Sequence, residues 1–254
     1  MFKQVSFTCL IALWATALCA QGAPQTLSSA LPLGESIMDK YIGATGGMAA
    51  YKALKNTVIK GAMDVPAMGI KANLTIYASE PNLTLQEMEI PGLGKMLEGV
   101  DGKVAWGFSS MTGPTIKTGK IAEAALNEAQ FRAEDWKSKY VKVETVALET
   151  VEGEECYKVL LTPKAGEPLI NHYSKSSGLL IKSETSSDTE MGKITIEILF
   201  KDYRKVGEML MPFKMDQKGA GQAMTIAITD IKTNADLPKS TFEPPAEVKA
   251  LMNK

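Results

Sequence analysis

The chain has 254 residues, with 28 Lys and Arg against 29 Asp and Glu, so its formal net charge is −1. A charge this balanced gives no electrostatic reason to bind nucleic acid or an anionic membrane surface. The length suits one large β domain as readily as two small ones, and no linker or low-complexity segment divides the chain, which favours a single domain.

Residues 1–20, MFKQVSFTCLIALWATALCA, have the pattern of a secretory signal peptide. Lys3 supplies an early positive charge, and the apolar run that starts at Val5 is shorter than the roughly 20 residues of a membrane span. We predict cleavage after Ala20, with Ala23 as the alternative, which leaves residues 21–254 as the mature domain. Lys3 is the only charged residue removed, so the net charge of the mature chain is −2.

Cysteine usage fits export without disulfides. Cys9 and Cys19 lie in the predicted leader, so Cys156 has no partner within the mature chain. A lipid anchor on Cys19 is not expected, because that signal requires a small residue just before the cysteine and Leu18 stands there. No later segment is long and apolar enough to span a membrane, so we expect a periplasmic product in a bacterial envelope.

Helical periodicity is confined to a few segments. Residues 33–54 carry apolar side chains at helical spacing, with a break at Gly46 and Gly47, which predicts a helix, a glycine corner and a second short helix. Residues 120–131 form a helical stretch rich in Ala and Glu, and residues 244–252 predict a last helical turn or two.

Most of the remaining chain alternates with a period of two. In residues 70–78 the side chains of Ile70, Ala72, Leu74 and Ile76 face one way while polar residues face the other, as in a half-buried strand. About eleven strands follow from this reading. They are expected at 56–63, 70–78, 83–90, 103–108, 139–148, 155–162, 168–174, 178–187, 193–200, 207–217 and 222–231.

These elements predict a mainly β fold of the α+β kind. A meander of strands with one apolar face must cover that face, and the available helices are few and short. We therefore expect one curved antiparallel sheet wrapped around the N-terminal helix as an unclosed barrel.

Apolar residues occupy connections that are normally polar. Residues 64–69 and 91–98 are the clearest cases, and the chain is rich in methionine, whose flexible thioether suits apolar ligands of variable shape. One interpretation is that these residues cap the ends of the core or form a subunit contact. The other is a hydrophobic cavity with a lid formed by the two connections. The residues predicted to form this cavity and lid are Met63, Met68, Met88, Leu93, Met96, Leu97, Trp106 and Phe108.

Catalytic and cofactor signals are weak. Cys156 and His172, the only histidine, fall in neighbouring predicted strands, but a cysteine in a strand is most often a small buried hydrophobe. One Cys and one His do not make a zinc or copper site, and no glycine-rich phosphate-binding motif opens a helix. We expect no catalytic residues, metal or cofactor.

Four stretches resemble the LolA/LolB-like periplasmic superfamily, in particular its outer-membrane lipoprotein-sorting proteins. They are DKYIGATGGMAAYKALKN, VDGKVAWGF, VEGEECYKVLLTPKAGEPLINHYSKSSGLLIKSE and FKDYRKVGEMLMPFKM, in the family's order and over most of the mature chain. The resemblance implies an incomplete β-barrel closed by helices, with an apolar interior that receives the lipid-modified end of lipoproteins. The chain departs from the dedicated carrier at its arginine-bearing and loop positions, because Arg132 and Arg204 are the only arginines and neither can be matched to them.

The expected function is that of a periplasmic carrier that shelters acyl chains of a lipoprotein or lipid for transfer toward the outer membrane. Its partners would be those acyl chains and, with them, a membrane transporter or an outer-membrane acceptor. The alternatives are a non-enzymatic protein-interaction or stress-sensing module on the same fold, and an enzyme that uses Cys156 and His172.

Overall fold

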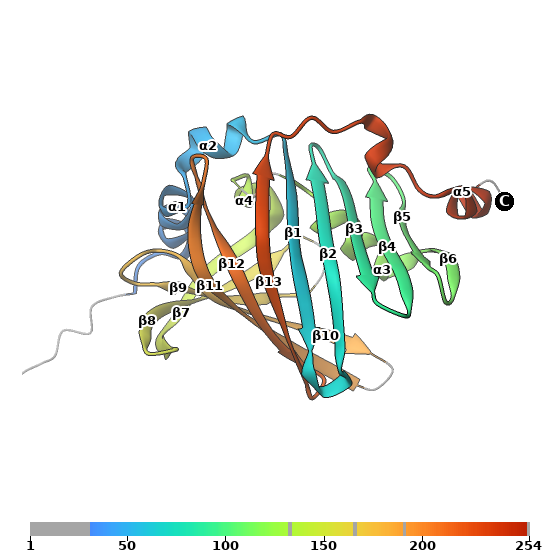
Figure 1. Cartoon of the computed structure of the whole chain (residues 1–254). Helices are drawn as coiled ribbons and strands as arrows, with labels where there is room; N and C mark the ends of the chain where they lie inside the picture. Colours follow the sequence, from blue (N-terminus) through green and yellow to red (C-terminus); the bar gives the residue numbers. More distant parts are fainter. Residues whose placement is uncertain (1–30, 132–133, 165–166, 190–191, 253–254) are drawn as a thin grey trace, which may run out of the picture. The chain divides into compact units, whose positions relative to one another are not determined.

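The computed structural model describes residues 31–131, 134–164, 167–189 and 192–252. The predicted signal peptide and its cleavage site lie outside these residues. Within them the chain forms one antiparallel sheet of thirteen strands in the order β6-β5-β4-β3-β2-β1-β13-β12-β11-β10-β9-β8-β7. Strands β6 and β7 stand at the two ends of this order and do not pair with each other, so the sheet curves but does not close (Figure 1).

The strands are long and are mostly joined by short turns. Their bounds are β1 Asn56–Val65, β2 Ile70–Ser79, β3 Leu83–Ile90, β4 Gly94–Asp101, β5 Ala105–Ser109, β6 Gly113–Ile116, β7 Tyr140–Val151, β8 Glu154–Pro163, β9 Leu169–Ser174, β10 Leu180–Thr189, β11 Gly192–Val206, β12 Met209–Gly219 and β13 Gln222–Thr233. The predicted curved, unclosed, mainly β architecture is therefore confirmed.

Five helices and two 3-10 turns complete the described chain. They are α1 Gly34–Ala44, α2 Gly47–Ala53, η1 Pro66–Met68, α3 Gly119–Glu128, α4 Trp136–Lys139, η2 Lys239–Phe242 and α5 Ala246–Met252. The glycine corner between α1 and α2 is as predicted, since Gly46 and Gly47 have φ of 138° and 78°, which favour glycine.

One prediction about these elements is wrong. Residues 91–98 were expected to form a lid loop, but most of them belong to β4, which pairs with β3 and with β5. Met96 and Leu97 point to opposite faces of this strand, which begins at Gly94. Only the turn Pro91–Leu93 remains outside the sheet.

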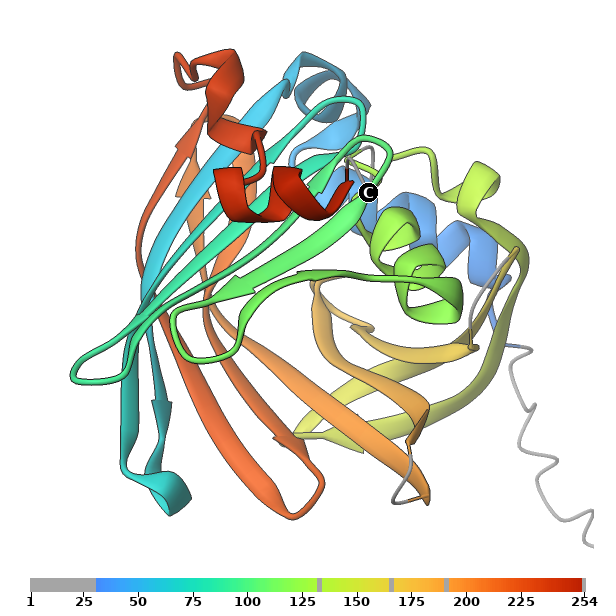
Figure 2. The same cartoon turned by 90° about the vertical axis from the view of Figure 1, so that its right-hand side faces the viewer.

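Helices α1 to α4 lie at the two flanks of the concave face of the sheet (Figure 2). On one flank α1, α2 and α4 pack on β8, β9 and β12 in a core that includes Ile37, Val159, Leu161 and Tyr173. On the other flank α3 packs through Ala129 against Val100 and Ala105. The middle strands of the sheet lie between these two covered flanks.

Candidate functional site

Strand register places a set of large apolar side chains on the concave face. Met63 of β1 lies opposite Ala72 of β2 and Ile226 of β13, and Ile226 lies opposite Met215 of β12. Because paired residues share a face, the row continues to Phe200 of β11. The side chains so placed, here called the concave apolar face, are Ile59, Met63, Leu74, Ile76, Met88, Ile198, Phe200, Met215, Ile226 and Ile228.

The concave apolar face keeps partial contact with solvent. Leu74 and Ile228 are buried, but the other eight side chains have intermediate exposure. The described helices are short, and their core contacts are made on the two flanks. A run of β-branched and thioether side chains that its own fold covers only in part is a surface suited to an apolar ligand.

The predicted site residues divide between three places. Met63 and Met88 belong to the concave apolar face, and Met96, 41% exposed, lies beside Met88 on the same side. Met68 and Leu93 stand at hairpin tips and are 56% and 48% exposed. They do not fold over the concave apolar face as a lid.

Leu97, Trp106 and Phe108 lie on the convex face, so the eight residues do not line one surface. Leu97 is adjacent to Met96 in β4 and points the other way, and its pairing with Phe108 carries Phe108 to the same side. Trp106 lies two residues before Phe108 and is fully buried there. Register decides this placement, because a shift of one residue exchanges the faces of a strand.

A C-terminal segment, residues 234–252, covers these convex side chains. Asn56 anchors its start, because its side chain donates to the carbonyl of Ala235 at 3.0 Å and accepts from the amide of Ala235 at 2.8 Å. Phe242 and Val248 then pack with Leu85 and Trp106 in a separate core. In the sequence this segment offers only scattered apolar residues, among them Leu237, Phe242 and Val248, which do not say what it covers.

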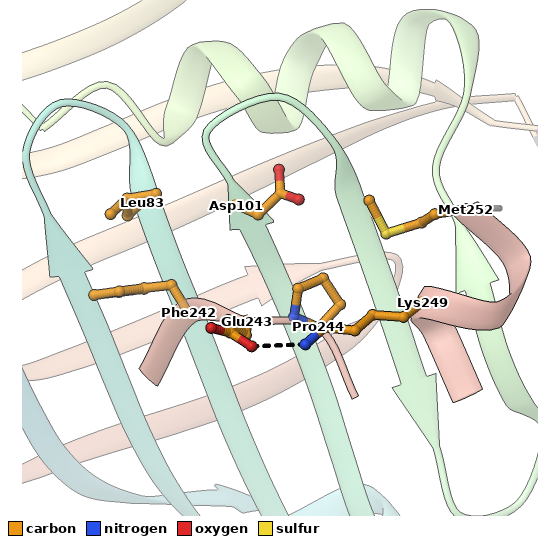
Figure 3. Close-up of a pocket in the computed structure, with 7 residues that line it drawn as sticks. All are labelled: Leu83, Asp101, Phe242, Glu243, Pro244, Lys249 and Met252. Carbon is orange, nitrogen blue, oxygen red and sulfur yellow. Dashed lines mark hydrogen bonds and ion pairs between the residues drawn. The ribbon is translucent and has the colours of Figure 1, made fainter. Parts of the chain in front are cut away.

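Two hollows in the described chain are small. One, of about 310 Å³, lies between the C-terminal segment and the convex face (Figure 3). The sheet contributes Leu83 and Asp101 to it, and the segment contributes Phe242, Pro244 and the ion pair of Glu243 with Lys249, 2.6 Å. The other, of about 100 Å³, lies at the end of the concave face and is lined by Val65, Gln217, Gly219, Gln222, Ala223 and Met224.

Beside the concave apolar face, under α1, lies a polar and aromatic cluster. The amide nitrogen of Asn171 donates to the hydroxyl of Tyr173 at 2.9 Å, and the rings of Tyr41 and Tyr173 are 5.4 Å apart. Burial raises the pKa of Tyr41, Tyr173 and Tyr203 well above that of an exposed phenol, so these hydroxyls stay neutral. The neutral hydroxyl of Tyr173 donates to the sulfur of Met38 in α1 at 3.2 Å, which links α1 to the sheet without placing a charge next to the apolar side chains.

Cys156 and His172 lie on the convex face, in neighbouring strands. The register pairs Cys156 with Ser174 and His172 with Lys158, and His172 Nε2 lies 3.2 Å from a carboxylate oxygen of Glu149. Burial raises the pKa of the Cys156 thiol to about 11, the reverse of the change that activates a nucleophilic cysteine. Burial also lowers the pKa of His172, against the opposing effect of Glu149.

Two features are absent from the described residues. No group of three or more His, Cys, Asp or Glu side chains there is arranged to hold a metal ion. None of the helices described is both long and apolar enough to cross a bilayer.

Comparison with solved structures identifies the architecture. No protein-family model and no curated protein matches the sequence. A LolA superfamily protein from Nitrosomonas europaea aligns with a TM-score of 0.59 and 15% identity, over 84% of this chain and 99% of its own. A putative outer membrane lipoprotein-sorting protein domain from Vibrio parahaemolyticus aligns with a TM-score of 0.58 and 12% identity, over 86% and 97% of the two chains.

The fold is LolA-like. A DUF1329 family protein from Desulfovibrio piger shares it at a TM-score of 0.59 and 11% identity, over 84% of this chain and 98% of its own. At these identities the likeness concerns the course of the backbone.

Proposed function

We propose that this chain is a periplasmic carrier that shelters an acyl chain of a lipid or lipoprotein on the concave apolar face. The observation that carries the proposal is the continuous row from Phe200 through Met215, Ile226 and Met63, partly exposed although every member is large and apolar. The LolA-like fold supports it, since one neighbour of that fold is a putative outer membrane lipoprotein-sorting domain.

Affinity would come from the exclusion of water rather than from directed chemistry. Each methylene removed from water contributes about 0.8 kcal/mol, so affinity should rise with the length of the acyl chain until the face is filled. Methionine and isoleucine side chains supply contacts without fixing one ligand shape. The transfer partners in this proposal are a membrane transporter as donor and an outer-membrane acceptor.

The native cargo can be identified directly. Protein purified from the envelope of its own organism is extracted with organic solvent, and the extract is analysed by mass spectrometry. We expect lipids or acylated peptides in stoichiometric amounts. Protein that repeatedly carries none would instead support the protein-interaction or stress-sensing alternative.

The binding surface is tested with a fluorescent long-chain fatty acid. The double variant Met63→Gln, Ile226→Gln keeps side-chain size but introduces two amides into the concave row, and we expect affinity to fall by about tenfold or more. The matched control is Met48→Gln, Val141→Gln, at exposed positions on α2 and β7. Equal affinity in the two variants would place the ligand elsewhere.

A further inference from the structure

The rim of the sheet that lies farther from α2 carries three apolar hairpin tips. Strands β1, β3 and β5 run in the same direction, so the turns that follow them lie at the same rim (Figure 1). The most exposed apolar side chain of each turn is Met68, 56% exposed, Leu93, 48%, and Met111, 72%. Pro66, Ala67 and Pro91 beside them are also exposed. These six residues are here called the apolar rim.

The opposite rim has a different chemistry. The turns between β2 and β3, β4 and β5, and β11 and β12 contain Glu80, Lys103 and Glu208. Charged and polar turns are the usual choice at a solvated edge. Along β1–β6 the sheet therefore has one polar rim and one apolar rim, whereas the turn that follows β12 beside the first apolar tip is flanked by Lys218 and Gln222.

Along β1–β4 the charges next to the apolar rim occur in pairs of opposite sign. Lys71 lies 3.7 Å from Asp64, and Lys95 lies opposite Glu89 in the sheet. The turn at Met111 is flanked by serine, threonine and glycine, without a charge. A partner for this rim would gain little from electrostatic attraction and would have to accept separated apolar side chains.

We propose that the apolar rim docks into the surface of a lipid bilayer. A protein partner would need three pockets at the spacing of the tips, whereas the interface of a bilayer accepts apolar side chains at any spacing. Tips of this kind, each flanked by glycine with positive φ such as Gly69, Gly92 and Gly113, present their side chains beyond the sheet.

The apolar rim lies next to the concave apolar face, so docking would bring that face close to the bilayer. The hollow of about 100 Å³ next to β1 is lined by Val65 and Met224, directly behind the first tip. Met88 and Met96 likewise follow behind the second tip on the concave side. An acyl chain leaving the bilayer at this rim would reach the concave apolar face past Val65 and Met224. Docking itself requires only the rim, so it can be tested apart from the proposed function.

The experiment measures flotation of the exported protein with vesicles of phosphatidylcholine alone. The variant Met68→Gln, Leu93→Gln, Met111→Gln removes the three exposed side chains, and we expect its vesicle affinity to fall by about tenfold or more. The matched control, Met48→Gln, Ile121→Gln, Val141→Gln, removes as many exposed apolar side chains from α2, α3 and β7 and should bind like the parent protein. All variants share the residues before Leu31, so that segment cannot cause a difference between them.

Three results would overturn the proposal. The parent protein would fail to float with the vesicles, or both triple variants would lose vesicle affinity equally. The third is binding that requires phosphatidylglycerol and disappears when salt is added. Thermal unfolding checks that the rim variant is folded, and its affinity for the fluorescent fatty acid should be unchanged. Loss of fatty-acid binding in the Met63 and Ile226 variant with normal flotation would separate the two sites.

A second readout locates the contact. Tryptophan is placed at Met111 or, as a control, at Val141, and quenching by phosphatidylcholine brominated in its acyl chains is measured. Trp106 and Trp136 are buried and give a constant background. We expect quenching for M111W and not for V141W, and equal quenching in both would contradict docking through the rim.

Discussion

At the scale of single residues, Gly99 explains how a tryptophan fits flat against the sheet. A Cβ at Gly99 would lie 2.4 Å from Cζ2 of Trp106, a distance that no side chain tolerates. The glycine is thus required by the close approach of the indole, and its backbone conformation is an ordinary one for a strand. The sequence places Gly99 and Trp106 seven residues apart, but only the pairing of β4 with β5 sets one over the other.

Substitution of this glycine should destabilise the fold. Gly99→Ala is expected to lower the free energy of unfolding by about 1 to 3 kcal/mol, because the indole or the strand must move. The control is Gly43→Ala in α1, where a Cβ meets nothing within 4 Å and helix propensity predicts a gain of about 0.5 to 1 kcal/mol. Denaturant unfolding measures the free energy of unfolding of both variants. A change of the same sign in both would contradict the packing described.

His172 links stability to pH. It is fully buried, lies 3.2 Å from Glu149 and 3.7 Å from Glu184, and faces Lys158 and Lys182 in the neighbouring strands. Burial lowers its pKa below the ordinary value of about 6.5, so the unfolded chain takes up the proton first as the pH falls. As the pH falls, stability is therefore lost between the pKa of His172 in the unfolded chain and its lower pKa in the folded protein.

The prediction is a melting temperature that drops between about pH 7.5 and about pH 5.5. His172 is the only histidine, so His172→Gln should remove most of this drop. Glu149 also has a lowered pKa, chiefly through its hydrogen bond from Lys158, but its contribution is lost only at more acidic pH. An unchanged drop in the variant would assign the pH dependence to another group.

At the scale of elements, the C-terminal segment covers apolar side chains on the convex face. Without it, Leu85 and Trp106 would be an exposed apolar patch on the outside of the sheet. Residues 244–252 were predicted to be helical and α5 confirms this, but no local pattern predicts that the helix returns across β5 and β6. That contact joins residues more than a hundred positions apart.

A matched pair of variants tests the importance of this segment. Phe242→Ala should lower the free energy of unfolding by about 3 kcal/mol, since the ring is buried against Trp106 and Leu85. Met252→Ala, in the same segment but 37% exposed, should cost less than about 1 kcal/mol. Tryptophan fluorescence during denaturant unfolding reports both, and a small effect of Phe242→Ala would mean that the segment packs only loosely.

At the scale of the whole molecule, the sheet is open because the chain contains too little helix to fill it. Thirteen described strands form a broad concave face, whereas the described helices on that face have at most eleven residues. The flanks are packed and the middle is left partly exposed, next to a rim of apolar tips. The apolar side chains that the fold leaves partly uncovered are the reason that both proposals concern lipid.

The sequence by itself determined eleven of the thirteen strands and the helices α1, α2, α3 and α5, because alternation and helical spacing are local properties, but it missed β4 and β6. It also showed that several turns carry apolar residues, methionine among them, where polar residues are usual. It did not determine which apolar residues share a face across strands, and so Trp106 and Phe108 were grouped with Met63 although they lie on the other side. Only the tertiary structure decided this, because the face of each side chain depends on pairing register and on which distant segment covers it, and both are set by contacts between residues far apart in the chain.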